Sequence, residues 1–93
     1  MRPTLHKTDA NQRKIMNALR NIGATVCDLA PVGDGCPDIL VGFRGVNYLI
    51  EIKNMDGRGM RFTEAEQEFK DTWRGQWTVV TNVDQAIAVV EAV

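Results

Sequence analysis

The sequence predicts a mixed α/β domain whose elements follow the order αβββαβα around a small central sheet. Two apolar runs separated by a short glycine-flanked loop indicate a hairpin, and apolar residues at helical spacing before and after it indicate the flanking helices. The 93 residues have room for one hydrophobic core. We therefore expect an N-terminal arm over 1–8 and one domain over 9–93.

The first helix is expected over 10–22. Asp9 and, three residues later, Gln12 resemble a capping box, and apolar residues then recur at helical spacing until Gly23, a natural helix end. A strand is expected over 24–29. The residues after it are rich in glycine and proline, which indicates a loop.

The hairpin is expected from strands over 39–41 and 46–53, joined by a loop over 42–45. Even-numbered residues of the second strand are apolar, and the alternation of a strand predicts that they face the core. Glu51 and Lys53, both odd-numbered, are then expected to share the opposite face.

Two helices and a strand follow the hairpin. Thr63 and Glu66 form a second capping box, which predicts a helix over 64–73. A strand is expected over 77–81. Asn82 comes next and is placed to cap the last helix.

The hairpin carries ionisable residues where a buried sheet rarely has any. A two-residue loop would place Asp38 directly opposite Glu51, whereas a four-residue loop would place it opposite Leu49, diagonal to Glu51. Both registers put the two carboxylates on one face, about 5 to 8 Å apart at their Cβ atoms. A three-residue loop would put them on opposite faces.

Two carboxylates this close repel each other unless a proton or a cation lies between them. Their hard oxygen atoms suit Mg²⁺ or Mn²⁺, which retain water ligands and accept a phosphate oxygen. Lys53 beside such a cation is placed to steady a phosphate or the attacking water. This combination predicts phosphodiester hydrolysis. The alternative interpretation is an ordinary solvated strand face.

The rest of the composition narrows the choice of function. Cys27 and Cys36 lack partner histidines at zinc spacing, and His6 is the single histidine, which argues against a zinc site or a catalytic Cys–His pair. No signal core or membrane-spanning run is present, so we expect a cytoplasmic protein. The net charge is −1, but residues 1–20 hold five basic residues against one acid, a distribution that suits one-sided contact with DNA.

The chain resembles the PD-(D/E)XK nuclease superfamily and, more narrowly, is similar to the small stand-alone VRR-NUC domain proteins of phages and bacteria. That similarity rests on three stretches, which are Gly35-Cys36-Pro37-Asp38-Ile39-Leu40-Val41-Gly42, Ile50-Glu51-Ile52-Lys53, and Gln67 after the Thr63 cap. It implies a restriction-endonuclease-like αβββαβ core with a C-terminal helix.

The resemblance also implies an Mg²⁺- or Mn²⁺-dependent endodeoxyribonuclease. Asp38, Glu51 and the Ile52 carbonyl would ligate the metal. Lys53 would orient water or stabilise the phosphate, and Gln67 would support the site from the second helix. Stand-alone members are associated with homodimers that cleave branched DNA, including four-way (Holliday) junctions. The expected partners are therefore DNA and a second copy, in a bacterial cell or a phage-infected host.

One departure from the family pattern concerns the first helix, where members often have an acidic residue that also serves the metal. Here the corresponding stretch offers Asn11 and Gln12, which coordinate through an amide oxygen without adding charge, and the alternative is that Asp9 substitutes from the cap. The absent acid supports one alternative function, a DNA-binding module without cleavage activity. A second alternative is a purely structural or assembly protein in which the charged strand face is a solvated surface. Four basic residues are candidates for contact with DNA phosphates: Arg13, Lys14, Arg58 and Arg61.

Overall fold

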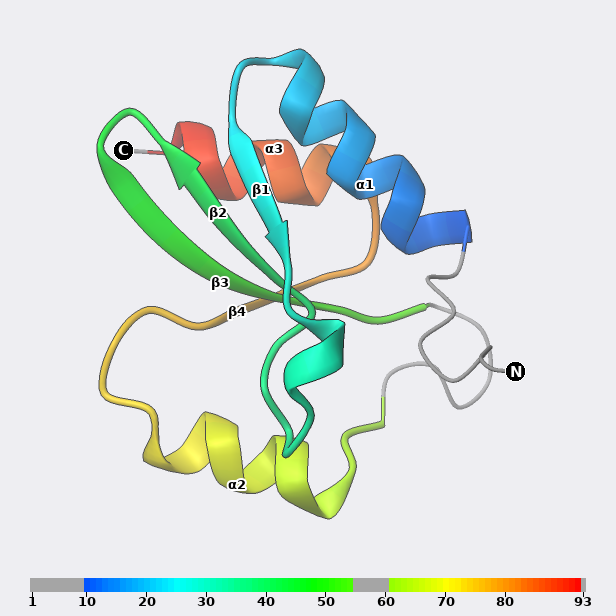
Figure 1. Ribbon diagram of the computed structural model, residues 1–93, viewed down its shortest axis with the longest axis vertical. Coiled ribbons are helices and arrows are strands. Elements are labelled where there is room, and N and C mark those ends of the chain that lie inside the picture. Colours follow the sequence, from blue (N-terminus) through cyan, green and yellow to red (C-terminus); the bar gives the residue numbers. More distant parts are fainter. Residues whose placement is uncertain (1–9, 55–60, 93) are drawn as a thin grey trace.

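The computed structural model describes residues 10–54 and 61–92. Its elements are α1 (Ala10–Asn21), β1 (Thr25–Asp28), the 3₁₀ turn η2 (Ala30–Val32), β2 (Ile39–Phe43), β3 (Val46–Ile52), α2 (Glu64–Thr72), β4 (Thr78–Val80) and α3 (Val83–Glu91) (Figure 1). The predicted order αβββαβα is confirmed, and η2 is an addition to it. The predicted arm over 1–8 lies outside the described residues.

The four strands form one mixed sheet in the order β1-β2-β3-β4. β2 pairs antiparallel with both β1 and β3, whereas β3 and β4 are parallel. α1 and α3 lie together against the sheet, and α2 lies apart from them at the other end of the molecule (Figure 1). Among the described residues, no helix is long and apolar enough to cross a bilayer.

The hydrophobic core lies between the sheet and the pair α1 and α3. Tyr48 and Ile50 of β3 are buried in it, and Val46 and Ile52 pack against its edge, which confirms the predicted alternation. The Tyr48 hydroxyl donates a hydrogen bond to the Val90 carbonyl of α3 over 3.4 Å. The other buried apolar residues are Ile15, Met16, Leu19, Ala24, Ile39, Val41, Val80, Ala86 and Val90.

The hairpin between β2 and β3 closes through a two-residue turn. Phe43 pairs with Val46, so Arg44 and Gly45 form the turn, and both have positive φ angles of 53° and 79°. Two positive φ angles are typical of a type I′ turn, whose twist matches that of the flanking strands. β2 is therefore two residues longer than predicted.

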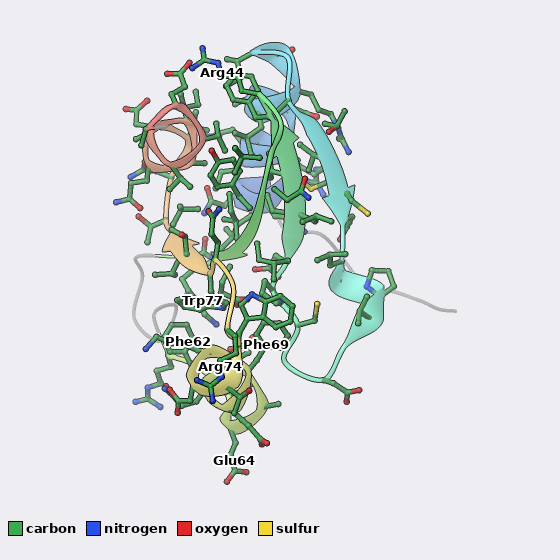
Figure 2. The ribbon with its side chains drawn as sticks, turned by 90° about the vertical axis from the view of Figure 1, so that its left-hand side faces the viewer. Arg44, Phe62, Glu64, Phe69, Arg74 and Trp77 are labelled. Atoms are coloured by element: carbon green, nitrogen blue, oxygen red, sulfur yellow. The ribbon has the colours of Figure 1, made fainter. Side chains whose placement is uncertain are left out.

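Helix α2 has no buried residue, and a pair of aromatic side chains lies near each of its ends. Phe62 meets the Trp77 ring edge to face at 5.8 Å between centroids, and Phe69 stacks on Trp73 at 5.0 Å. Figure 2 shows Trp77 between the sheet and α2, with Phe62 and Phe69 beside the helix. The Phe62 ring, shortly before α2, also lies 5.0 Å from the Nζ of Lys53, directly after β3, so this side chain links the two elements.

The sheet face opposite α1 and α3 carries two adjoining hollows of about 180 and 380 Å³. Both are lined by Leu40 and Asn47, so they lie next to each other on this face. The described residues that line them are all uncharged: Thr25, Val26, Cys27, Leu40, Gly42, Asn47, Leu49, Trp73, Gly75 and Gln76.

Candidate metal centre

Asp38 is fixed at the point where β2 begins and β3 ends. Its main-chain carbonyl accepts a 2.8 Å hydrogen bond from the Leu29 N–H, and its carboxylate Oδ2 accepts one of 2.7 Å from the Ile52 N–H. Ile39 pairs with Ile50, and this register places Asp38 directly opposite Glu51. Of the three registers left open by the sequence, the two-residue turn is therefore the one observed.

Glu51 is buried, with 3% of its surface exposed. Burial raises the pKa of its carboxyl to about 8, and the charges of Asp38 and Glu66 act in the same direction, while Lys53 opposes them. A carboxylate buried to this extent does not belong to a solvated strand face, so that interpretation is wrong for Glu51. Its ionisation depends on a cation close by.

Lys53 lies among acidic and aromatic groups directly after β3. Its Nζ is 3.2 Å from Glu51 Oε2 and 2.8 Å from Glu66 Oε1, and it lies 5.0 Å from the centroid of the Phe62 ring. Burial alone would lower the pKa of Lys53, but the hydrogen bond to Glu66 and the charge of Glu51 outweigh it, so the pKa is raised. Its main-chain N–H donates to the Val80 carbonyl over 2.9 Å, which extends the pairing of β3 with β4.

Glu66 is a member of this cluster that the sequence interpretation used only as a helix cap. Its Oε1 accepts hydrogen bonds from the Thr63 N–H over 2.9 Å and from Lys53 Nζ over 2.8 Å. Burial acts to raise the pKa of Glu66, but these two hydrogen bonds outweigh it and the pKa is lowered. The capping box was itself the signal, because it fixes which residue of the first turn faces back toward the helix start.

Gln67 lies on the exposed side of α2. Its Nε2 donates a 2.9 Å hydrogen bond to Asp71 Oδ1, one turn further along the helix. The structure thus brings Glu66, and not the neighbouring Gln67, into contact with Lys53. The supporting role that the resemblance implies for Gln67 stays a prediction.

Asn11 and Gln12, the candidates on the first helix, lie in different surroundings. Asn11 Nδ2 donates to Asn54 Oδ1 over 3.0 Å and to the Thr81 carbonyl over 3.2 Å, which joins α1 to the residues that follow β3 and β4. Gln12 is buried, and its Nε2 lies 3.9 Å from Met16 Sδ. Asn11 is therefore tied to the residue directly after Lys53, whereas Gln12 contacts the core.

The predicted DNA contacts are exposed where the structure describes them. Arg13 and Lys14 lie on the outer surface of α1, and Arg61 is exposed shortly before the Thr63 cap. Arg58 lies outside the described residues. Side chains of arginine and lysine on a protein surface are common contacts of DNA phosphates.

The donor groups of the cluster fit a hard divalent cation. Over 10–54 and 61–92, no three His, Cys, Asp or Glu side chains are arranged to hold a metal ion. The predicted ligand set needs only Asp38 and Glu51, with the Ile52 carbonyl and water completing the shell, as Mg²⁺ and Mn²⁺ accept. A divalent cation bound here would offset the repulsion between the buried Glu51 and its acidic neighbours. Burial and the charges of the nearby Glu51 and Asp38 also raise the pKa of the Cys36 thiol.

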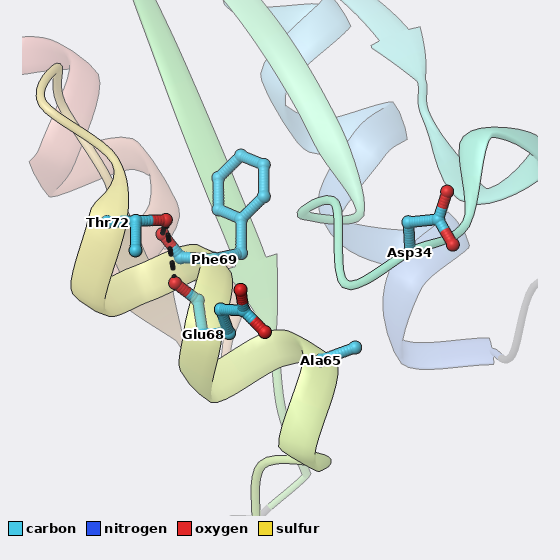
Figure 3. A pocket seen from close by; sticks show the side chains of 5 residues that line it. All are labelled: Asp34, Ala65, Glu68, Phe69 and Thr72. Carbon is cyan, nitrogen blue, oxygen red and sulfur yellow. Dashed lines mark hydrogen bonds between the residues drawn. The ribbon is translucent and has the colours of Figure 1, made fainter.

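A separate hollow of about 340 Å³ lies between the loop before β2 and helix α2 (Figure 3). Its described lining residues are Asp34, Ala65, Glu68, Phe69 and Thr72. They include two acids and no basic residue, so the hollow does not suit a phosphate, and it is distinct from the carboxylate cluster.

Comparison with known proteins gives one informative likeness. No family model matches the sequence, and no curated protein matches it. A solved structure described as a "VRR_NUC domain" is similar to this chain with a TM-score of 0.66 and 22% sequence identity. The alignment covers 86% of this chain and 89% of that one. At this identity the likeness shows the fold, and the architecture predicted from the sequence is confirmed.

Proposed function

We propose that this chain, which has the fold of a VRR_NUC domain, is a metal-dependent and structure-selective DNA endonuclease. The observation that carries the proposal is the buried Glu51 directly opposite the half-buried Asp38, with Lys53 beside it, on a fold named for a nuclease domain. A buried carboxylate next to a second carboxylate is costly for stability, and groups with strongly shifted pKa values cluster at functional sites.

Asp38, Glu51 and the Ile52 carbonyl are the groups that would hold Mg²⁺ or Mn²⁺. When bound there, the cation supplies an activated water and offsets the charge that develops on the phosphate. The Ile52 N–H holds one carboxylate oxygen of Asp38, so the pair is orientated before any ligand arrives. Oxygen ligands that are already in position lose little freedom on binding.

Lys53 supplies a positive charge at the same place. Its ammonium group lies next to Glu51, where it can meet a phosphate oxygen or orient the attacking water. Only 11% of the Lys53 side chain is exposed, so its charge is weakly screened by solvent. Asn11 supports the residues after β3 through its bond to Asn54.

Branched DNA, in particular the four-way junction, is the proposed substrate. The exposed Arg13, Lys14 and Arg61 would contact phosphates, as would Arg58. Paired incisions across a junction require two sites, which a homodimer supplies. The uncharged hollows around Leu40 on the open sheet face suit the same face of a second copy better than they suit DNA.

A cleavage panel tests the proposed reaction. The protein is incubated with four-way junction, flap and linear duplex DNA, each with Mg²⁺, Mn²⁺ or EDTA. We expect metal-dependent cleavage that is fastest on the junction, and its loss in Asp38→Ala and Lys53→Ala. Metal-independent cutting, or variants as active as the wild type, would refute the site. Junction binding without product under any metal would identify a binding module instead.

Light scattering after size exclusion tests the homodimer. We expect twice the 10.4 kDa chain mass for the wild type and the monomer mass for Leu49→Asp, which places a charge in the uncharged hollow. Thermal melting of the same variant verifies that it is folded. A monomeric wild type at micromolar concentration would contradict the dimer without affecting the metal site.

A further inference from the structure

Three neighbouring groups restrict the position of the Lys53 ammonium. A lysine ammonium stands on a flexible four-carbon stem, and free rotation spreads its charge over a wide volume. Here Nζ contacts Glu51 Oε2 at 3.2 Å and Glu66 Oε1 at 2.8 Å, and the Phe62 ring covers it at 5.0 Å. The shorter of the two ion pairs is the one with Glu66.

Glu51 has two competing uses. It is a predicted ligand of the metal and also a partner of Lys53. A carboxylate that ligates a divalent cation attracts an ammonium group less, and the two cations repel each other. Glu66 is not among the predicted ligands, so its bond to Lys53 is the contact that does not compete with the metal.

We propose that Glu66 is a positioning residue that holds the Lys53 ammonium beside Glu51 and Asp38, both with and without a bound cation. The inference rests on the proposed nuclease function for its consequence in catalysis. Its structural part, the coupling between Glu66 and Lys53, is testable in the protein alone. Glu66 reaches Lys53 from the first turn of α2, so the helix start and the strand end are joined by this pair.

Glu66 also caps its own helix, and the two roles can be separated. Glu66→Gln removes the charge but retains the capping box, because glutamine is the other residue that completes this motif. Thr63→Ala removes the other half of the box and leaves Glu66 charged. Glu64→Gln removes a charge from the same helical turn, and Figure 2 shows Glu64 directed away from the sheet.

The first test is a thermal double-mutant cycle in the metal-free protein. We expect Glu66→Gln to lower the melting temperature of the wild type by about 2 to 5 °C. In a Lys53→Met background the same change should lower it less, because the ion pair between Glu66 and Lys53 is already absent there. An equal decrease in both backgrounds would overturn the proposal, since it would show that Glu66 acts as a cap alone.

The second test measures single-turnover cleavage of a four-way junction at saturating Mn²⁺. We expect Glu66→Gln to reduce the cleavage rate by about tenfold or more, while the Kd for DNA changes by less than about twofold. In a Lys53→Met background, Glu66→Gln should not reduce the cleavage rate further. Glu64→Gln and Thr63→Ala should retain the wild-type rate within about twofold. A Glu66→Gln rate equal to the wild type would overturn the catalytic part. If the wild type cleaves no DNA, the proposed function fails, and the thermal cycle alone decides whether Glu66 positions Lys53.

Discussion

The carboxylate of Asp38 accepts a 2.7 Å hydrogen bond from the main-chain N–H of Ile52, fourteen residues later in the chain. Asp38 directly precedes β2, so its side chain, and not the main chain of a strand, accepts the hydrogen bond from the last residue of β3. The bond fixes the predicted ligand Asp38 to the peptide unit between Glu51 and Ile52. The geometry of the site is thus built into the pairing of the hairpin.

This bond predicts different outcomes for two substitutions of Asp38. Asp38→Asn retains an oxygen acceptor for the Ile52 N–H but loses the charge, so we expect a melting temperature close to the wild type and a loss of metal-dependent cleavage of about a hundredfold or more. Asp38→Ala loses the acceptor as well and should be destabilised by about 1 to 3 kcal/mol. Urea denaturation and the junction assay measure the two effects. Cleavage by Asp38→Asn at the wild-type rate would remove Asp38 from the metal site.

The raised pKa of Glu51 predicts how stability depends on pH in the absence of metal. The folded carboxyl titrates near 8 and the unfolded one near 4.5, so the folded state binds more protons between these values. Stability should therefore fall as pH rises from about 5 to 8, by an amount on the order of 1 to 3 kcal/mol. The measurement is the free energy of unfolding by urea in EDTA at several pH values.

Glu51→Gln is the matched variant for this pH dependence. Glutamine keeps the shape of the side chain without a titrating group, so the decrease in stability over this range should largely disappear. The lowered pKa of Glu66 acts in the opposite sense, because its contribution is lost only as the pH falls toward acid. A slope unchanged in Glu51→Gln would assign the dependence to another group.

Two glycines in the loop before β2 provide a prediction about how α2 is seated. Gly35 and Gly33 both have positive φ angles, of 79° and 74°, but a Cβ at Gly35 would collide with the Ala65 carbonyl of α2, whereas a Cβ at Gly33 would meet open space. Gly33→Ala should cost about 1 to 3 kcal/mol from backbone strain, because the φ of 74° and ψ of −163° at Gly33 lie in a region that is essentially restricted to glycine. Gly35→Ala should cost distinctly more, about 2 to 4 kcal/mol. Equal losses in chemical denaturation would show that the approach of α2 to this loop is not tight in solution.

Metal binding should also be visible as a change in stability. A cation that binds the folded carboxylate pair and not the unfolded chain raises the melting temperature as its concentration rises. We expect this shift with Mn²⁺ for the wild type, an absence of it for Glu51→Gln, and an enlarged shift for Lys53→Met, which no longer competes for Glu51. Addition of EDTA should reverse it. A wild type that is insensitive to Mn²⁺ would contradict the ligand set.

The elements were predictable because their signals are local. The caps at Thr63 and Asn82, the alternation along β3 and the helical spacing of α1 each depend on a few neighbouring residues. The register of the hairpin was not predictable, because the sequence gives no signal for a positive φ at Arg44. Only Gly45 favours the two-residue turn that is observed. The pairing of Asp38 with Glu51 depended on that choice.

The closeness of Asp38, Glu51 and Lys53 was predictable from the two strands, the contact of Glu66 with Lys53 was not predicted, and the role of Gln67 stays a prediction. Adjacent residues of an α-helix point about 100° apart, so an inference that selects Gln67 in place of Glu66 selects a different face. The burial of Glu51 could not be predicted from the sequence either, because it depends on how β3 packs against residues that are distant in the chain.

The attachment of α2 has a consequence for how the molecule opens. Glu51 lies on a strand of the buried core, and Asp38 directly precedes another. The helix that carries Glu66 has no buried residue and is held by half-buried rings, the ion pair with Lys53 and a close approach to Gly35. Local unfolding begins where little apolar surface is buried, so amide protons of α2 should exchange with solvent well before those of β3. Helix α2, and with it Glu66, can therefore unfold locally while the sheet that positions Glu51 stays folded.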